Sequence, residues 1–163
     1  MRKATQPPVL DAVGIHRALE QLHGVVRAKG LKNSEVRDAV ARVALAYDGH
    51  FTVEDLVKTL RETGTVEAHP ATVYRIVPLL VEAGLLQETL VSAGEGHRYE
   101  RAFEREHHDH LICTSCGKVV EFEFEAIEVL QRNIAERFGF YLTGHVHELF
   151  GLCSKCAPKG GTR

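Results

Sequence analysis

Four cysteines constrain this chain more than any other feature, because they form two Cys-x-x-Cys pairs. Cys113 and Cys116 make the first pair, Cys153 and Cys156 make the second, and residues 117–152 separate them. Each pair lets one tight turn present two sulfurs to one ion, and two such turns complete a tetrahedral site, the usual structural zinc site. We therefore expect Zn(II) to hold the C-terminal part of the chain together rather than to perform chemistry. Buried cysteine pairs and a redox dithiol are the alternatives.

A second metal-binding pattern immediately precedes the first cysteine pair. On an extended segment, neighbouring side chains point to opposite faces, so His108 and His110 share one face while His107 and Asp109 share the other. One short strand can therefore supply two separate metal sites, each completed by ligands from elsewhere. Nitrogen and carboxylate donors suit Fe(II), Zn(II), Mn(II), Co(II) or Ni(II) without selecting sharply among them. A solvated, histidine-rich hinge is the alternative. The candidates for the missing ligands are His50, Glu100, Glu128 and His145.

The first hundred residues have the pattern of a winged helix. Apolar residues recur at helical spacing over residues 9–29, 36–47, 53–63 and 70–83. Two strands, residues 85–91 and 97–101, then surround a glycine-containing turn at residues 92–96. Pro78 removes an amide from the fourth helix, so we expect a kink there or a cost of about 3 kcal/mol that packing offsets.

The fourth helix is the candidate recognition helix. The net charge of −2 gives no general support for nucleic-acid binding, so contact with DNA has to come from a local patch. A three-helix bundle that packs on another partner is the alternative. The positions whose side chains suit a DNA groove are Ala71, Thr72, Tyr74 and Arg75.

The composition changes after residue 101, where a charged segment leads into the stretch rich in histidine and cysteine. This change predicts an α+β chain of two domains. We expect a DNA-binding domain at residues 1–101 with its wing at about 85–101, a hinge at 102–106, and a metal-binding domain at 107–163. In the last domain we expect strands at 111–113 and 118–123, a helix at 125–138, and a strand region at 140–150 broken by Gly144.

Several classes of protein are disfavoured by what the sequence lacks. It contains no long uncharged apolar run and no signal peptide, so we expect a cytoplasmic protein without a membrane partner. It contains no His-Glu-x-x-His, no glycine-rich phosphate loop and no nucleophile elbow, so we expect neither an enzyme nor a small-molecule substrate. A zinc-dependent hydrolase and a zinc-stabilised adaptor without DNA binding are the distant alternatives.

The motifs together resemble one family. The stretch HHDHLICTSCGKVVEF, followed by a helix, by His145-Val-His and by CSKC, resembles the C-terminal domain of the ferric uptake regulator (Fur) family. The stretches HFTVEDL and HPATVYRIVPLLVEAGLL resemble that family's DNA-binding domain. The resemblance implies a homodimeric, metal-sensing repressor that binds a palindromic, A/T-rich DNA operator through an N-terminal winged helix and dimerises through a C-terminal α/β domain.

The resemblance also implies which residues carry each role. The four cysteines become the structural zinc site. The regulatory site takes His50, Glu100, His108 and His110, and an additional site takes His107, Asp109, Glu128 and His145. Basic Lys32 and Arg37 join the DNA-binding residues, and Lys32 can reach a minor groove or a phosphate. Glu100 lies ten residues before His110, one more than in much of the family, so Glu104 can replace it as the ligand.

The same resemblance gives an expectation for the metal that is sensed. We expect Fe(II), with repression of metal-uptake genes, because the zinc-responsive branch often uses an additional cysteine and all four cysteines here are already assigned. The peroxide-sensing branch tends to have an aspartate in place of Glu100. Zinc-, manganese- or peroxide-responsive regulators of the same family are the alternatives.

Overall fold

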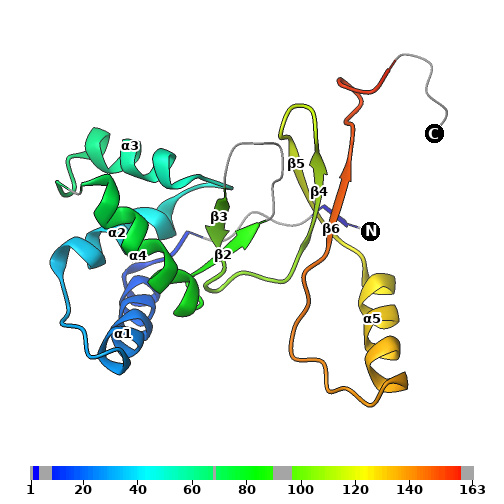
Figure 1. Ribbon diagram of the computed structural model, residues 1–163, viewed down its shortest axis with the longest axis horizontal. Coiled ribbons are helices and arrows are strands. Elements are labelled where there is room, and N and C mark those ends of the chain that lie inside the picture. Colours follow the sequence, from blue (N-terminus) through cyan, green and yellow to red (C-terminus); the bar gives the residue numbers. More distant parts are fainter. Residues whose placement is uncertain (1, 4–8, 68, 90–96, 159–163) are drawn as a thin grey trace. The chain divides into compact units, whose positions relative to one another are not determined.

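The computed structural model describes residues 2–3, 9–67, 69–89 and 97–158, and these fall into two compact units. The N-terminal unit contains the described residues from 9 to 89 and from 97 to 105. The C-terminal unit contains residues 106–158 together with Arg2 and Lys3. Figure 1 shows the helices and strands of each unit. The α+β class expected from the sequence is confirmed, while the predicted limits of the hinge stay a prediction.

The N-terminal unit is built on helices whose ends follow local sequence signals. Asp11 caps the first helix, because its side chain accepts a hydrogen bond from the Gly14 amide at 2.8 Å. Thr52 and Asp55 form the predicted capping box at the start of the third helix, and Gly64 ends that helix in the left-handed conformation at φ 61°. The helices are α1 (Ala12–Ala28), α2 (Glu35–Ala46), α3 (Val53–Thr63) and α4 (Pro70–Glu82).

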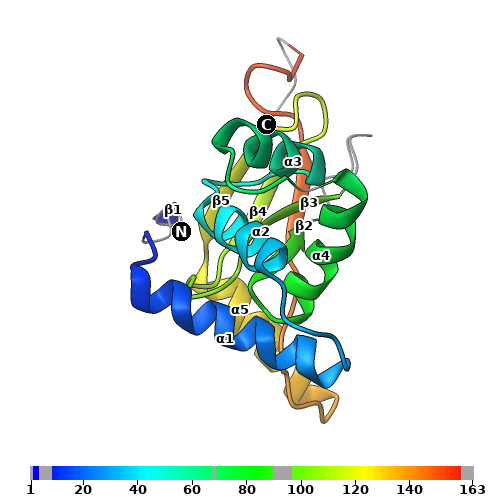
Figure 2. The same ribbon diagram turned by 90° about the vertical axis from the view of Figure 1, so that its left-hand side faces the viewer.

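The N-terminal unit has one apolar core to which all four of these helices contribute. Figure 2 shows α2 between α1 and α3, and α2 buries Val40, Ala41, Ala44 and Leu45. From α1 itself, Ala18, Leu19, Leu22 and Val26 are buried in this core. The first helix is therefore an integral part of the N-terminal unit and not an appendage.

Helix α4 continues through Pro78 from Pro70 to Glu82. The proline ring is on the exposed side of the helix. The hydrogen bond that Pro78 cannot make is offset by packing on the opposite side, because the α4 residues Val73, Val77 and Leu80 are completely buried.

The predicted wing is a hairpin of β2 (Leu86–Thr89) and β3 (Arg98–Arg101), which pair antiparallel with Gln87 opposite Glu100. The turn expected at residues 92–96 lies outside the described residues. Phe51, just before α3, is joined to β3 by reciprocal backbone hydrogen bonds with Tyr99 at 2.9 and 2.8 Å. Helices followed by this hairpin confirm the winged-helix pattern.

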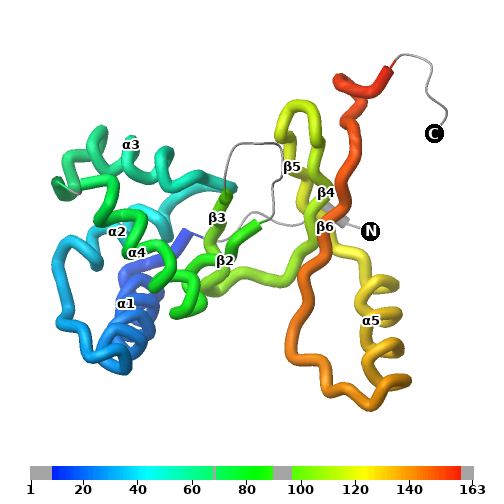
Figure 3. Tube along the Cα trace, viewed as in Figure 1, coloured from blue at the N-terminus to red at the C-terminus, as the bar shows by residue number. Residues whose placement is uncertain are grey.

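The C-terminal unit contains a sheet in the order β1-β5-β4-β6. Strand β4 pairs antiparallel with β5 and parallel with β6, so segments far apart in the sequence lie side by side (Figure 3). The elements are β1 (Arg2–Lys3), β4 (Asp109–Cys113), β5 (Val119–Glu123), α5 (Glu125–Arg137) and β6 (Glu148–Gly151).

The prediction of a strand over residues 140–150 was wrong for most of its length, since the last strand begins only at Glu148. The physical reason is the parallel pairing of β6 with β4. The chain leaving α5 has to return to the start of β4 before it can pair in that direction, and residues 140–147 make this connection without strand structure.

Candidate functional site

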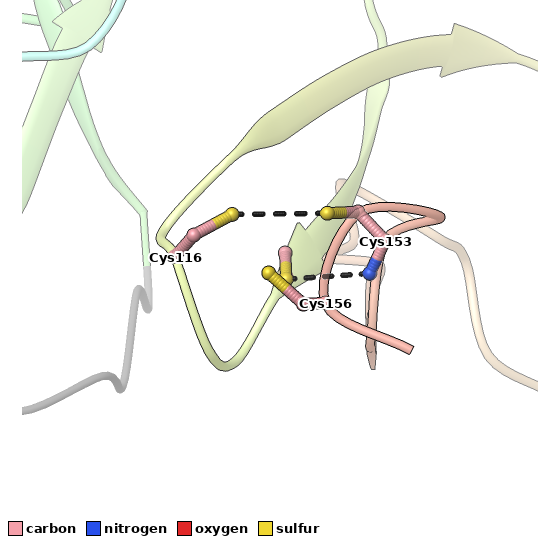
Figure 4. A group of neighbouring side chains, drawn as sticks. Cys116, Cys153 and Cys156 are labelled. Carbon is pink, nitrogen blue, oxygen red and sulfur yellow. Dashed lines mark hydrogen bonds between the residues drawn. The ribbon is translucent and has the colours of Figure 1, made fainter. Parts of the chain in front are cut away.

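The two cysteine pairs meet in one cluster. Cys113 ends β4 and Cys116 follows in a tight turn that Gly117 closes at φ 68°, while the second pair sits in a turn after β6. Because β4 and β6 are neighbours, the two turns lie together, and the four sulfurs are within 4.8 Å of one another. Figure 4 shows Cys116 and Cys153 facing each other, with sulfurs 3.8 Å apart. Zinc–sulfur bonds of about 2.3 Å in a tetrahedron place sulfurs about 3.8 Å apart, so the cluster fits zinc.

Backbone hydrogen bonds in this cluster favour the thiolate form of a cysteine, which is the form that binds a cation. Hydrogen bonds from the backbone amides of Cys153, Cys116 and Ser115 lower the pKa of the Cys113 thiol to about 6. The Cys153 amide donates to the Cys113 sulfur at 3.3 Å. All four cysteines are free thiols, which is the state from which metal thiolates form.

A second cluster brings together three separate segments of the C-terminal unit. His107 and Asp109 precede or begin β4, Glu128 lies in the first turn of α5, and His145 lies in the connection before β6. Their ligand atoms are all within 4.8 Å of one another. The Nε2 atoms of His107 and His145 are 2.8 Å apart, and each is within 3.4 Å of a Glu128 oxygen. Ligand bonds of about 2.0–2.2 Å to one ion require donor separations of this size.

Asp109 gives an independent indication that this cluster suits a cation. Its carboxylate is buried, and neither oxygen has a hydrogen bond of ordinary geometry among the described residues. The nearby ring nitrogens are those of His107 at 3.3 Å, His145 at 3.8 Å and His147 at 3.3 Å. His147 is a potential further donor that the sequence analysis did not select, although the His-x-His spacing on residues 145–147 could have indicated it.

In the N-terminal unit, His50 and Glu100 form a pair. His50 Nε2 lies 3.4 Å from a Glu100 oxygen, and both side chains are largely buried. The backbone bridge between Phe51 and Tyr99 causes this proximity, because it holds the residues next to them side by side. The structure therefore brings together the two residues of this unit that were predicted for the regulatory site.

Glu100 also has other partners within its unit. Gln87 donates to Glu100 Oε1 at 2.7 Å, and the guanidinium of Arg105 donates to Oε2. Glu104, the alternative ligand, pairs instead with Arg17 of α1 at 2.6 Å and has a positive φ of 51°. The geometry of the N-terminal unit thus favours Glu100 over Glu104 as the partner of His50.

The other two predicted regulatory residues, His108 and His110, lie just before and at the start of β4, on the face opposite to that of Asp109. The rings of His108 and His110 are in contact, with centroids 4.9 Å apart. His108 Nδ1 hydrogen-bonds to the carbonyl oxygen of Glu106 at 3.0 Å, which fixes Nε2 as the nitrogen that carries the lone pair. Glu121 of β5 is directly opposite His110, and its carboxylate is within 4.8 Å of that ring. The sequence analysis missed Glu121, because only strand register reveals this pairing.

The residues predicted for DNA contact on α4 lie on its outer side. Ala71, Tyr74 and Arg75 are exposed and Thr72 is partly exposed. The Arg75 Nε–H donates to the Ala71 carbonyl at 3.1 Å. The Tyr74 hydroxyl donates to the carboxylate of Glu54 on α3, a residue that sequence reasoning had not selected.

Lys32 and Arg37 lie in and after the loop between α1 and α2. Lys32 is exposed. The guanidinium of Arg37 donates to the backbone carbonyl of Lys32 at 2.9 Å, so it orders the loop that presents the lysine.

Comparison with known proteins gives these clusters a context. Residues 28–150 match the model of the ferric uptake regulator family. The chain is 39% identical over 140 residues to the ferric uptake regulation protein of Campylobacter jejuni. The aligned region covers 85% of this chain and 87% of that protein. The chain belongs to the ferric uptake regulator family. This membership confirms the resemblance noted from the motifs.

Solved structures agree with the assignment to the Fur family. The Helicobacter pylori regulator, described as having three functional metal-binding sites, superimposes with a TM-score of 0.75 at 28% identity over 99% of this chain and 100% of that one. A zinc uptake regulator solved with zinc and DNA gives a TM-score of 0.51 at 29% identity, over 86% of this chain and 93% of that one.

Family membership settles the class of activity. This Fur-family protein is a metal-responsive, dimeric DNA-binding regulator and not an enzyme. Among the described residues, no helix combines the length and the apolar character needed to cross a bilayer.

Proposed function

We propose that this Fur-family protein is an Fe(II)-dependent repressor of metal-uptake genes that acts in the cytoplasm, where it binds palindromic operator DNA. Two pairs of potential donors, one pair within each unit, support the proposal. His50 and Glu100 are paired in one unit, and His108 and His110 are in contact in the other.

The regulatory residues are proposed to bind one ion jointly. A divalent cation supplies positive charge and directional coordination bonds, and these donors are histidine nitrogens and a carboxylate, which suit Fe(II). His50 and Glu100 belong to the winged helix, whereas His108 and His110 belong to the unit that we propose to dimerise. Joint coordination therefore fixes the orientation of one unit against the other. In a dimer this orientation sets the spacing of the two recognition helices relative to half-sites one helical turn apart.

The remaining clusters are proposed to have structural and supporting roles. Cys113, Cys116, Cys153 and Cys156 hold zinc and join the ends of β4 and β6. His107, Asp109, Glu128 and His145 hold a further ion that ties α5 to the sheet. On the DNA side, Ala71, Thr72, Tyr74 and Arg75 face the major groove, and Lys32 contacts a phosphate or the minor groove near Arg37.

A variant of His50 tests the proposed coupling. His50→Ala is expected to keep the dimer and the cysteine-bound zinc but to lose the metal-dependent part of operator affinity. Coupling of about 1–3 kcal/mol corresponds to about 5- to 150-fold in affinity. Fluorescence anisotropy with the promoter of the protein's own gene, with and without Fe(II), measures the effect. His16→Ala, on an exposed histidine of α1, is the matched control. Metal-activated binding that survives in His50→Ala contradicts the proposal.

The choice of metal has its own test. Operator affinity is measured at buffered free concentrations of Fe(II), Zn(II) and Mn(II). We expect activation by Fe(II) at concentrations at which the other ions leave the affinity low. A Zn(II) or Mn(II) response at lower free concentration assigns the protein to another branch of the family.

A further inference from the structure

The recognition helix α4 and its neighbour α3 are linked by a side-chain contact on the exposed surface. Tyr74 is in the second turn of α4 and is 51% exposed. Its hydroxyl donates a hydrogen bond to a carboxylate oxygen of Glu54, which lies in the first turn of α3. The two residues are 20 positions apart in the sequence, so the contact depends on how the two helices pack.

Both groups are in the protonation state that this hydrogen bond needs. The bond from Tyr74 is the largest of the effects that lower the pKa of Glu54, and the bond to Glu54 is the largest of those that raise the pKa of Tyr74. At neutral pH the glutamate is therefore an ionised acceptor, and the phenol keeps the proton that it donates.

The charge of Glu54 is unexpected on a surface for which DNA contact is proposed. Glu54 and Tyr74 line one groove together with Lys58, Arg61 and Glu62. A carboxylate in this position repels the DNA backbone, and its removal is expected to strengthen binding to any duplex. If Glu54 contributes to operator recognition, it must do so through a second effect that offsets this electrostatic repulsion.

We propose that Glu54 is a positioning residue for operator recognition, which holds the Tyr74 ring in the orientation that contacts operator bases. The inference rests on the proposed role of α4 as the recognition helix. Tyrosine has few rotatable bonds, so one hydrogen bond at its far end selects among its side-chain orientations before DNA binds. Glu54 therefore affects two separable quantities: affinity for all DNA through its charge, and preference for the operator through Tyr74.

Substitutions that separate charge from hydrogen bonding test this role. Glu54→Gln keeps an oxygen acceptor and removes the charge, so affinity for the operator and for a scrambled duplex should rise by the same factor. Glu54→Ala removes the charge and the acceptor, so the preference for the operator over the scrambled duplex should fall about 3- to 10-fold. Glu62→Gln, which removes a charge from the same groove, is the matched control and should leave the preference unchanged.

A double-mutant cycle with Tyr74 shows whether the two residues act together. Tyr74→Phe keeps the ring and removes the donor, and it should lower the preference for the operator by a factor similar to that of Glu54→Ala. The double variant Glu54→Ala/Tyr74→Phe should lose no more than either single variant. The measurement is anisotropy with the Fe(II)-loaded protein on its own promoter and on a base-scrambled duplex of the same length.

Two results would overturn the inference: a preference for the operator that is unchanged in Glu54→Ala, or losses that multiply in the double variant. The hydrogen bond itself is checked without DNA by ultraviolet titration of the tyrosines, in which Glu54→Ala should lower the pKa of Tyr74 toward its ordinary value. Unmodified protein that does not prefer its promoter contradicts the proposed function, and the positioning role is then refuted with it. A preference that is normal and independent of Glu54 refutes the positioning role alone.

Discussion

Asp109 and Glu100 are both almost completely buried carboxylates, but their surroundings differ. Asp109 is near the ring nitrogens of three histidines, none of which makes it a hydrogen bond of ordinary geometry. Glu100 accepts hydrogen bonds from Gln87 and from the guanidinium of Arg105. A buried charge is tolerated only when it is compensated, so Arg105 stabilises Glu100 without a metal. A metal ion that binds Glu100, the proposed ligand, must therefore compete with the guanidinium of Arg105 for the carboxylate.

Arg105→Gln is expected to raise the affinity of the regulatory site for a divalent cation by about 10-fold, because the ion no longer competes with the guanidinium. The same substitution should lower the stability of the metal-free protein by about 1–3 kcal/mol, since it weakens compensation of a buried carboxylate. Competition with a fluorescent chelator and urea unfolding measure the two effects. Arg17→Gln, which removes an exposed arginine paired with Glu104, is the control. An unchanged metal affinity contradicts the prediction.

Cys113→Ser should remove zinc from the cysteine cluster, because a serine hydroxyl does not replace a thiolate ligand. We expect a loss of stability of about 3–5 kcal/mol, which lowers Tm by roughly 6–20 °C. Elemental analysis and thermal unfolding measure these outcomes. Lys155→Ala, in the second cysteine turn, should retain the zinc. A serine variant that has normal Tm after the zinc is lost would show that the cluster contributes nothing to folding.

At the scale of elements, α1 has a clear structural role. Its buried side contributes Ala18, Leu19, Leu22 and Val26 to the core of the N-terminal unit. On its exposed side, Arg17 pairs with Glu104, which lies in the segment after the wing. The helix therefore stabilises the winged helix mainly through its buried side, because an exposed ion pair contributes little.

Leu22→Ala should lower the free energy of unfolding by about 2–5 kcal/mol, because Leu22 is completely buried and its removal leaves a cavity. Urea unfolding followed by circular dichroism measures the change. Val13→Ala on the same helix, where the valine is 64% exposed, should cost less than about 0.5 kcal/mol. Equal effects of the two substitutions would mean that α1 does not belong to the cooperative core.

At the scale of the whole molecule, the two units differ in how completely they bury apolar residues. The main apolar core lies entirely in the N-terminal unit. In the C-terminal unit, by contrast, the apolar stripe of α5 is open to solvent: Leu130 is 61% exposed, Ile134 58% and Phe138 76%. An exposed apolar surface of this kind is typical of a protein–protein interface. Because the protein belongs to a family of dimers, a second copy of the chain is the expected cover.

Phe138→Glu should therefore convert the dimer into a monomer, because it places a charge in the apolar stripe that the second copy covers. Analytical ultracentrifugation measures the change in mass, and operator affinity should fall at least about 10-fold because the two half-sites are no longer bound together. Arg132→Glu, on the other side of α5, reverses a charge on the same helix and should leave the dimer intact. A dimeric Phe138→Glu variant would place the interface elsewhere.

The sequence by itself determined the features that depend on local spacing. The capping box at Thr52 and Asp55, the cysteine turns and the helical period of α1 to α5 all arise from residues a few positions apart. The alternation of side chains along residues 107–110 likewise separated the two histidine clusters correctly, because a strand directs its neighbours to opposite faces.

The tertiary structure decided what depends on contacts between distant segments. The pairing of His110 with Glu121 requires the register of β4 against β5, and the pairing of Glu54 with Tyr74 requires the packing of α3 on α4. The shortened last strand and the Arg105 partner of Glu100 have the same origin. Local spacing fixes the side of an element on which a residue lies, but the partner on that side is selected by the free energy of packing the whole unit.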